Sequence, residues 1–296
     1  MRSSQLYRRL VTLPPLTYLL IFFAVPTLIM LLASFRYAGD YGGLAPWYYY
    51  EEGKLSFDLT LENWARLFES DIYWMLFLKS IIYALVTCLL CILMAYPLAL
   101  MIARSTKKKR DFLLLLVIMP FWSNFLVRIY AWMIIFSPSG VLTQIINSIL
   151  TPLGFEPVSL MYSPTAVIVT LVYVHLPFMV LPLYANLEKH DPALLDAAQD
   201  LGANAWQRFW SVTWPQSLPG VYAGSILVFI PVLGIFAVPE LLGGTDGIMI
   251  ANVIKQQFVE ARDWPFGSVL SIVMTVIAVS VVLLGARYAQ KGVGRD

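Results

Sequence analysis

The 296-residue sequence has few charged residues: Asp, Glu, Lys and Arg make up 13% of it, whereas 59% of its residues are hydrophobic. Soluble domains usually carry about 25% charged residues. A large soluble domain is therefore excluded, and the composition predicts a protein that crosses a membrane several times. The formal net charge of +2 says little, because the placement of charges in a membrane protein matters more than their sum.

Residues that commonly hold metals or carry out catalysis are also scarce. The sequence has two histidines, His175 and His190, and two cysteines, Cys88 and Cys91, in the apolar run CLLC. A multi-histidine metal site is excluded. We expect the cysteines to be small core residues and His175 to be a packed, hydrogen-bonded residue. Intramembrane Asp pairs, His clusters and exposed nucleophile motifs are missing, so neither catalytic nor metal-binding residues are predicted.

Long apolar runs are what the sequence has in abundance. About 20 apolar residues can span a bilayer as a helix. The first run is longer than that and lacks a clear cleavage site, so it predicts a retained helix rather than a signal peptide. We predict a single all-α membrane domain over residues 1–296, with spans at about 13–35, 74–103, 112–136, 163–186, 220–242 and 268–288.

Prolines and charges mark irregular places in these spans. Pro26 is expected to kink the first span, and Lys79 in the second can extend to the interface. The fifth span contains Pro231 and Gly234, and such breaks are tolerated where the freed backbone is buried in protein or lines a water-filled cavity. Arg128 in the third span lies deep enough that its charge needs a partner or a wet cavity.

The most structured polar segment is 187–219, which reads LEKHDPALLDAAQDLGANAWQRFWSVTWPQSLP between two apolar runs. Asp191 followed by proline predicts a helix start, because Asp caps free N–H groups and the proline loses no hydrogen bond there. Gly202 is a predicted helix end. Asn204 can cap a second short helix, and Pro215 is expected to end it. The pattern predicts a helix–Gly–helix elbow outside the bilayer.

The spacing within this elbow resembles the EAA loop of permease subunits in binding-protein-dependent ABC importers. That pattern is Glu-Ala-Ala, three residues, Gly, nine residues, Ile-x-Leu-Pro. Asp196, Ala197, Ala198, Gly202 and Pro215 fall in register here, although Asp replaces Glu, Val replaces Ile and Trp replaces Leu. In that family the elbow is the coupling helix, which docks in a groove of the cytoplasmic ATPase. An ordinary capped helical loop is the alternative interpretation.

Lys and Arg are unevenly distributed among the segments between the spans. Cytoplasmic loops carry an excess of these residues, and with the N-terminus inside, 13 of the 20 are cytoplasmic. Both termini and the elbow are therefore predicted to be cytoplasmic. The 13 residues are Arg2, Arg8, Arg9, Arg104, Lys107, Lys108, Lys109, Arg110, Lys189, Arg208, Arg287, Lys291 and Arg295.

Four further sequence segments narrow the resemblance to one group of these importers. PFWSNFLVRIYAW, FIPVLGIFAVPELLGG, MIANVI and DWPFGS look like the permeases of spermidine/putrescine importers, and the likeness extends from the second span onward. It implies a type I importer (MetI-like) fold in a bacterial inner membrane. It also implies a second, related permease, an external substrate-binding protein, surrounding lipid, and an ATPase dimer that binds ATP and Mg. We expect the chain to bind no nucleic acid and no cofactor of its own.

The substrate and the class of transporter each have alternatives. Related importers carry ferric iron, thiamine, opines or sulfate, and these substrates stay open. A stand-alone channel or secondary transporter would work alone, whereas this chain offers a docking elbow and few intramembrane charges to couple ions. The phosphate-binding loop GxxxxGK[ST] is missing from the sequence, so ATP is expected to bind to a partner.

A polyamine is a flexible polycation, which needs carboxylates along its path and aromatic faces for cation–π contact. Glu240, at the outer end of the broken fifth span, is the best-placed carboxylate, and Asp246 follows it. A cation is unhelpful in such a path, so Arg128 is expected to be structural. The aromatic candidates on the third span, for which interfacial packing is the alternative role, are Trp122, Tyr130 and Trp132.

Overall fold

Among the residues that the structure describes, six helical segments are long and apolar enough to cross a membrane, which is the number of spans predicted. The computed structural model describes residues 2–51 and 54–293, with side chains at 11–48 and 58–285. The chain divides into two compact units, which are described separately. The candidate spans are Val11–Ala33, Asp71–Ala103, Phe125–Leu153, Pro164–Leu187, Ala205–Gly234 and Trp264–Gly285.

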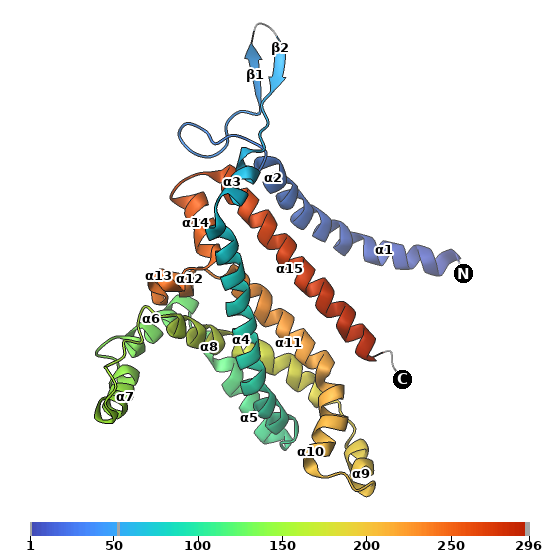
Figure 1. Ribbon diagram of the computed structural model, residues 1–296. Coiled ribbons are helices and arrows are strands. Elements are labelled where there is room, and N and C mark those ends of the chain that lie inside the picture. The colour runs from blue at the N-terminus through green and yellow to red at the C-terminus, as the bar shows by residue number, and fades with distance from the viewer. Residues whose placement is uncertain (1, 52–53, 294–296) are drawn as a thin grey trace. The chain divides into compact units, whose positions relative to one another are not determined.

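The first unit, residues 1–75 and 253–277, begins with a helix that a proline reshapes. α1 (Arg2–Leu19) passes through a π-helical turn into α2 (Val25–Ala33) (Figure 1). Pro26 has no N–H group, and its ring crowds the carbonyl four residues earlier. A wider π turn removes this conflict. The irregularity predicted at Pro26 is therefore present as a change of helical pitch.

A polar loop follows α2 and contains regular structure. β1 (Tyr48–Glu51) and β2 (Lys54–Phe57) pair as an antiparallel hairpin, which was not predicted. α3 (Glu62–Glu69) is amphipathic and buries Leu67. The helical fold class is confirmed for the spans, with this hairpin added outside them.

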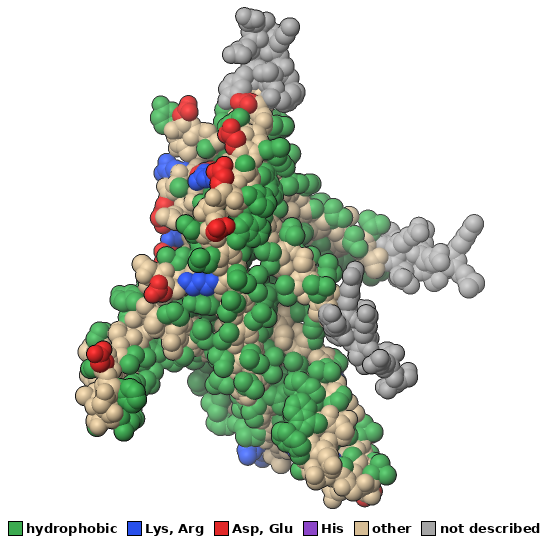
Figure 2. Space-filling model, in the orientation of Figure 1, with side chains coloured by type: hydrophobic (Ala, Val, Ile, Leu, Met, Phe, Trp, Pro, Cys, Tyr) green, Lys and Arg blue, Asp and Glu red, His purple; other side chains and the backbone are tan. Residues whose placement is uncertain are grey.

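A salt bridge joins α3 to the start of α15 (Trp264–Val293). Arg66 donates a 2.7 Å hydrogen bond to Asp263, and its guanidinium lies 4.1 Å from the centre of the Phe266 ring. Figure 2 shows charged side chains gathered around α3, whereas hydrophobic side chains cover the long helices. Polar contacts therefore hold the loop, and apolar faces are left for lipid or partner subunits.

The second unit, residues 76–252 and 278–296, holds most of the helix packing. Its elements are the rest of α4 (Asp71–Ala103), α5 (Lys107–Ile118), α6 (Phe125–Phe136), α7 (Val141–Leu150), α8 (Pro164–Leu187), α9 (Pro192–Asp200), α10 (Ala205–Arg208), α11 (Trp214–Gly234), α12 (Ala237–Leu242), α13 (Gly244–Gly247), the start of α14 (Ile250–Val259) and the end of α15.

α8 and α11 lie side by side in Figure 1 and pack more extensively than any other described helix pair. Two glycines on α11 permit this close approach. A Cβ atom at Gly224 would lie 2.6 Å from Met179 Sδ, and one at Gly220 would lie 2.7 Å from Asn186 Cβ. Small residues four apart commonly serve this purpose between membrane helices.

The scarce histidine and cysteine residues of the spans lie in the packed core. Cys88 and Cys91 are buried free thiols on α4. His175 on α8 is also buried, and its Nδ1 lies 2.9 Å from the carbonyl oxygen of Leu171. These positions confirm the predicted packing of all three side chains.

The third predicted span, 112–136, is not one helix. Pro120 cannot continue the hydrogen bonding of α5, which ends in a 3₁₀ turn at Met119–Trp122. Asn124 then caps α6, because its Oδ1 accepts a 2.8 Å hydrogen bond from the backbone N–H of Leu126. The loop predicted to follow α6 also contains a helix, α7.

Candidate functional site

The polar elbow at 187–219 folds as two helical arms, and α9 and α10 lie together at one end of α11 (Figure 1). Asp191 Oδ1 accepts a 3.0 Å hydrogen bond from the backbone N–H of Ala193, which caps α9 as predicted. Asn204 and Gln207 form a capping box, with both hydrogen bonds at 2.9 Å. Local sequence signals therefore set the start of both arms.

The turn between the arms is a Schellman motif. The backbone N–H groups of Gly202 and Ala203 donate to the carbonyls of Gln199 and Ala198, at 2.9 and 3.0 Å. Gly202 has φ +80°, a left-handed conformation that favours glycine. Arg208 ties the arms together through a 2.5 Å hydrogen bond to the side chain of Gln199.

The prediction that Pro215 ends the second arm is wrong. The chain runs from α10 through a π-helical turn, Phe209–Thr213, directly into α11. The wider turn accommodates the ring and the missing N–H of Pro215, so the helix continues past it. The second arm of the elbow is thus continuous with the fifth span.

The motif residues of α9 present an open surface. Asp196 and Ala197 are exposed, and Ala198 is partly exposed. Large apolar side chains lie nearby, because Leu201 is 89% exposed and Trp206 is 70% exposed. Apolar groups gathered at a polar loop are typical of a surface that a protein partner covers.

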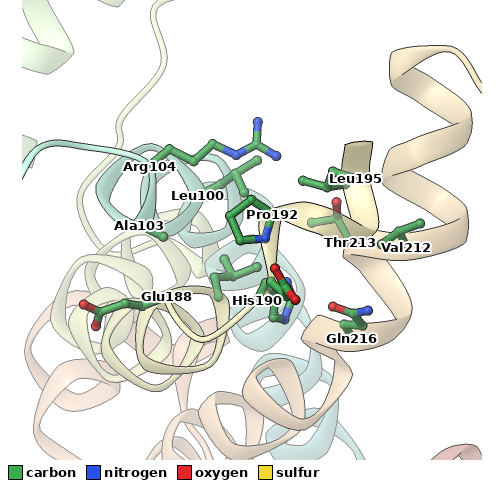
Figure 3. Close-up of a pocket in the computed structure, with 12 residues that line it drawn as sticks. Leu100, Ala103, Arg104, Glu188, His190, Pro192, Leu195, Val212, Thr213 and Gln216 are labelled. Atoms are coloured by element: carbon green, nitrogen blue, oxygen red, sulfur yellow. The ribbon is translucent and has the colours of Figure 1, made fainter. Parts of the chain in front are cut away.

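A cavity of about 320 Å³ lies behind α9, between the ends of α4 and α8 and the start of α11. Figure 3 shows Arg104, Pro192, Leu195 and Gln216 around it, whereas Glu188 points away. Interiors are normally close-packed. The hollow therefore leaves α9 room to shift relative to the helix ends that support it.

Glu188 belongs to a polar cluster that sequence reasoning missed. Its carboxylate forms a salt bridge with Arg110 and accepts a 2.5 Å hydrogen bond from the hydroxyl of Tyr184. The cluster fixes α5 to the chain where the elbow begins. Arg110 and Glu188 are 78 residues apart, and no local pattern indicates such a pairing.

The fifth span is interrupted, as predicted, although not at Pro231, which lies within α11. α11 ends at Gly234 and α12 follows, carrying an exposed Glu240. A tight turn follows α12, with Gly244 at φ +56°. Asp246, in the four-residue helix α13, is also exposed. Both candidate carboxylates are thus exposed at the broken end of α11.

The three candidate aromatic residues differ in their surroundings. α12 packs against both α6 and α8, so residues of the third span lie near the break. Trp122 is 72% exposed and Tyr130 is 51% exposed. Trp132 instead stacks on Phe136 at 5.0 Å and meets Tyr173 edge-on at 5.4 Å. Two of the three rings are therefore open to a cation.

Arg128 is surrounded by aromatic rings. Its guanidinium lies 5.6 Å from the ring centre of Phe121 and 5.8 Å from that of Phe125. In the part of the chain that the structure describes, its buried Nε has no hydrogen-bond acceptor. The two rings lie within the distance of cation–π contact, and the structural role predicted for Arg128 stays a prediction.

The family model described as "Binding-protein-dependent transport system inner membrane component" matches residues 95–291. The chain belongs to this family. The permease is 39% identical over 286 residues to the spermidine/putrescine transport system permease protein PotB of Salmonella typhimurium, covering 96% of this chain and 94% of that one. It is 44% identical over 220 residues to PotB of Escherichia coli K12, covering 74% and 78%. It is thus a subunit of an ABC importer, not an enzyme.

Solved structures confirm the fold of this importer permease. A bacterial ABC transporter for the acidic polysaccharide alginate, solved with an alginate-bound periplasmic protein, matches with a TM-score of 0.67. The match covers 98% of this chain and 95% of that one at 20% identity. Six spans and the family together place the permease in the inner membrane.

The predicted site residues of the permease form two groups, one at each end of α11. The elbow residues lie beside its start, and Glu240 and Asp246 follow its end. A helix of 21 residues is about 30 Å long. The two groups therefore cannot form one site, and α11 is the element that connects them.

Proposed function

We propose that this permease forms the path by which polyamines, such as spermidine and putrescine, are imported across the inner membrane with energy from ATP. The observation that carries the proposal is the identity of 39–44% to permeases named for spermidine/putrescine transport. The exposed Glu240 and Asp246 and the open rings of Trp122 and Tyr130 suit a polycation.

The partners proposed for the permease are those of its family. A cytoplasmic ATPase dimer would bind ATP and Mg, a second related permease would complete the path, and an external binding protein would deliver the substrate. The family description supports the last of these, as does the structural relative solved with a periplasmic protein. The exposed motif face of α9, with Leu201 and Trp206 beside it, offers the ATPase a docking surface.

The proposed mechanism is alternating access. Closure of the ATPase dimer would push on α9, which has a cavity behind it. Because α10 continues into α11, the push would travel about 30 Å to the break at Gly234. Movement at this break would change the side of the membrane from which Glu240 can be reached. A few carboxylates with aromatic faces would attract a polyamine without holding it too tightly for release.

Both termini and the elbow are proposed to be cytoplasmic. In a background with Cys88 and Cys91 replaced by Ala, we expect Glu62→Cys to react with an impermeant maleimide from outside, and Asp200→Cys only after permeabilisation. Both positions are exposed. Labelling of Asp200→Cys in intact cells would show that the topology is reversed.

Six of the cationic side chains that support this orientation, at Arg2, Arg8, Arg9, Arg287, Lys291 and Arg295, lie outside the described side chains.

The substrate proposal predicts selective transport. The permease, its partner permease, the ATPase and the binding protein are reconstituted in vesicles and offered spermidine, putrescine, thiamine and ferric iron. We expect ATP-dependent uptake of the polyamines alone. Uptake of thiamine or ferric iron instead of polyamines would assign the permease to another branch of the same importer class.

Glu240→Gln tests the path in the same vesicles, because it keeps the side-chain shape and removes the charge. Losing a contact to a charged group costs roughly 1.5–3 kcal/mol, so the half-saturation concentration for spermidine is expected to rise about tenfold or more. Assembly and basal ATPase activity should persist. The matched control is Glu156→Gln, an exposed carboxylate between α7 and α8. Normal uptake by a well-assembled Glu240→Gln complex would contradict the assignment.

A further inference from the structure

One lysine lies in an otherwise apolar part of α4. Lys79 follows the helix start at Asp71 by eight residues, about 12 Å along the axis. Its ammonium group donates a hydrogen bond to the backbone carbonyl oxygen of Asp246 in α13. The protein itself thus supplies a partner for the charge, whereas the expectation that Lys79 extends to the interface stays a prediction. Charges within a span are costly and commonly mark functional positions.

The surroundings of this ammonium are those that recognise a primary amine. The carbonyl oxygen of Asp246 accepts its hydrogen bond. Tyr83, one turn along α4, places its ring centre 5.8 Å from Lys79 Nζ and its hydroxyl 3.5 Å from the same carbonyl oxygen. The carboxylate of Asp246 is exposed beside this carbonyl group in the same residue. Carbonyls, aromatic faces and carboxylates together bind organic ammonium ions.

Anchoring α13 does not by itself require a charge. Ser80, the next residue, already joins α4 to the following segment, because its buried hydroxyl accepts a 2.9 Å hydrogen bond from the backbone N–H of Ile250. A neutral polar side chain at position 79 would also anchor the segment, and placing it within a membrane would cost less free energy than placing a charged one there. Anchoring α13 therefore does not explain why residue 79 carries a positive charge.

We propose that the carbonyl and carboxylate of Asp246 and the ring of Tyr83 form an ammonium-binding site in the import path, which Lys79 fills until a primary ammonium group of the substrate displaces it. This inference rests on the proposed polyamine function, since spermidine and putrescine end in the same chemical group as lysine. Two ammonium ions repel at one carbonyl oxygen, so only one occupies the site.

Displacement of Lys79 would release one of the contacts between α4 and the segment that follows α12. The hydrogen bond between Ser80 and Ile250 would stay in place. The turn before Asp246 contains Gly243 and Gly244, and the latter has φ +56°, so its backbone can change conformation readily. Arrival of a substrate would thus loosen the segment that follows Glu240 without detaching it.

The test measures spermidine binding to the intact permease–ATPase complex in lipid nanodiscs, without binding protein. Lys79→Met keeps an unbranched side chain that is one atom shorter and removes its charge, and Lys79→Arg keeps the charge. We expect the Lys79→Met complex to bind spermidine about tenfold more tightly. In the wild type, the ammonium group of Lys79 occupies the ammonium-binding site and reduces the fraction of sites that are empty, whereas a Met side chain does not. Lys79→Arg and the exposed-loop control Lys189→Met should match wild type. Unchanged or weaker binding by an assembled Lys79→Met complex overturns the proposal.

The wild-type complex provides a second measurement, which does not depend on the assembly of a variant. Saturating spermidine is expected to speed acetylation of Lys79 by acetic anhydride relative to Lys189, because the displaced amine loses its hydrogen bond. Unchanged or slower modification contradicts displacement. If the wild-type complex neither binds nor imports spermidine, the polyamine function itself fails. If it imports spermidine while both Lys79 measurements stay unchanged, only the ammonium site fails.

Discussion

Ala197→Arg in the assembled importer is expected to abolish ATP-coupled transport while leaving the permease inserted in the membrane. Ala197 is exposed on α9 and belongs to the small pair of the motif, where a partner surface can approach closely. An Arg side chain there would be enclosed by the ATPase without a matching carboxylate. An uncompensated buried charge costs roughly 3–5 kcal/mol, enough to weaken docking by about 100-fold or more.

Two measurements check this result: ATP-dependent uptake in vesicles, and copurification of the ATPase with the permease. Ala205→Arg is the matched control, since it makes the same change at an exposed position on the other arm of the elbow, outside the motif. The control should transport at close to the normal rate. Wild-type transport by Ala197→Arg would contradict the coupling role of α9.

The elbow could be predicted because its signals are local. Asp191 and Asn204 each cap a helix through backbone groups two or three residues away, and Gly202 is required by its own φ angle. A Cβ atom at Gly202 would meet nothing within 4 Å. Its role in the fold is therefore conformational rather than steric, which the sequence pattern alone does not distinguish.

Prolines were a less reliable guide, because neighbouring backbone can absorb them. Pro215 was expected to end a helix, yet the π-helical turn before it lets the helix continue. Pro231 likewise lies within α11, whereas Pro120 does interrupt the third span. Whether a proline breaks or only widens a helix depends on the packing around it, and single-sequence patterns do not contain that information.

Contacts between distant segments could not be predicted from the sequence. Arg66 pairs with Asp263 across 197 residues, and Lys79 bonds the carbonyl of Asp246 across 167. Neither pair has a periodic or local signature, since each depends on how the helices meet. The coupling and path roles of the elbow residues, Glu240 and the aromatic rings stay predictions, because they depend on partner chains.

The second large effect is expected for Gly224→Leu, at the closest contact between α8 and α11. A Cβ atom at this position would lie 2.6 Å from Met179 Sδ and 3.2 Å from the Met179 carbonyl oxygen. The sulfur could move aside, but the carbonyl belongs to the backbone of α8. Forcing extra atoms into a packed core typically costs about 1–3 kcal/mol, and a shift of a whole helix costs more.

Gly224→Leu is therefore expected to lower the thermal midpoint of the purified complex and its yield as a single species in size-exclusion chromatography. Gly224→Ala should have a smaller effect in the same direction. Ala223→Leu introduces the same side chain one residue earlier, at an exposed position of α11, and should leave both measurements near wild type. Equal stability of Gly224→Leu and Ala223→Leu would show that the two helices do not depend on this contact.

The consequence for transport follows from the connectivity of the two helices. α8 leads into the elbow and α11 leaves it, so their packing holds the elbow against the break at Gly234. If α8 and α11 separate, a push on α9 moves the start of α11 without a fixed support, and less of the movement reaches Glu240. Any Gly224→Leu complex that does assemble is thus expected to hydrolyse ATP with reduced spermidine uptake per ATP, whereas Ala223→Leu keeps the wild-type ratio. A wild-type ratio in assembled Gly224→Leu would mean that the signal reaches Glu240 by another route.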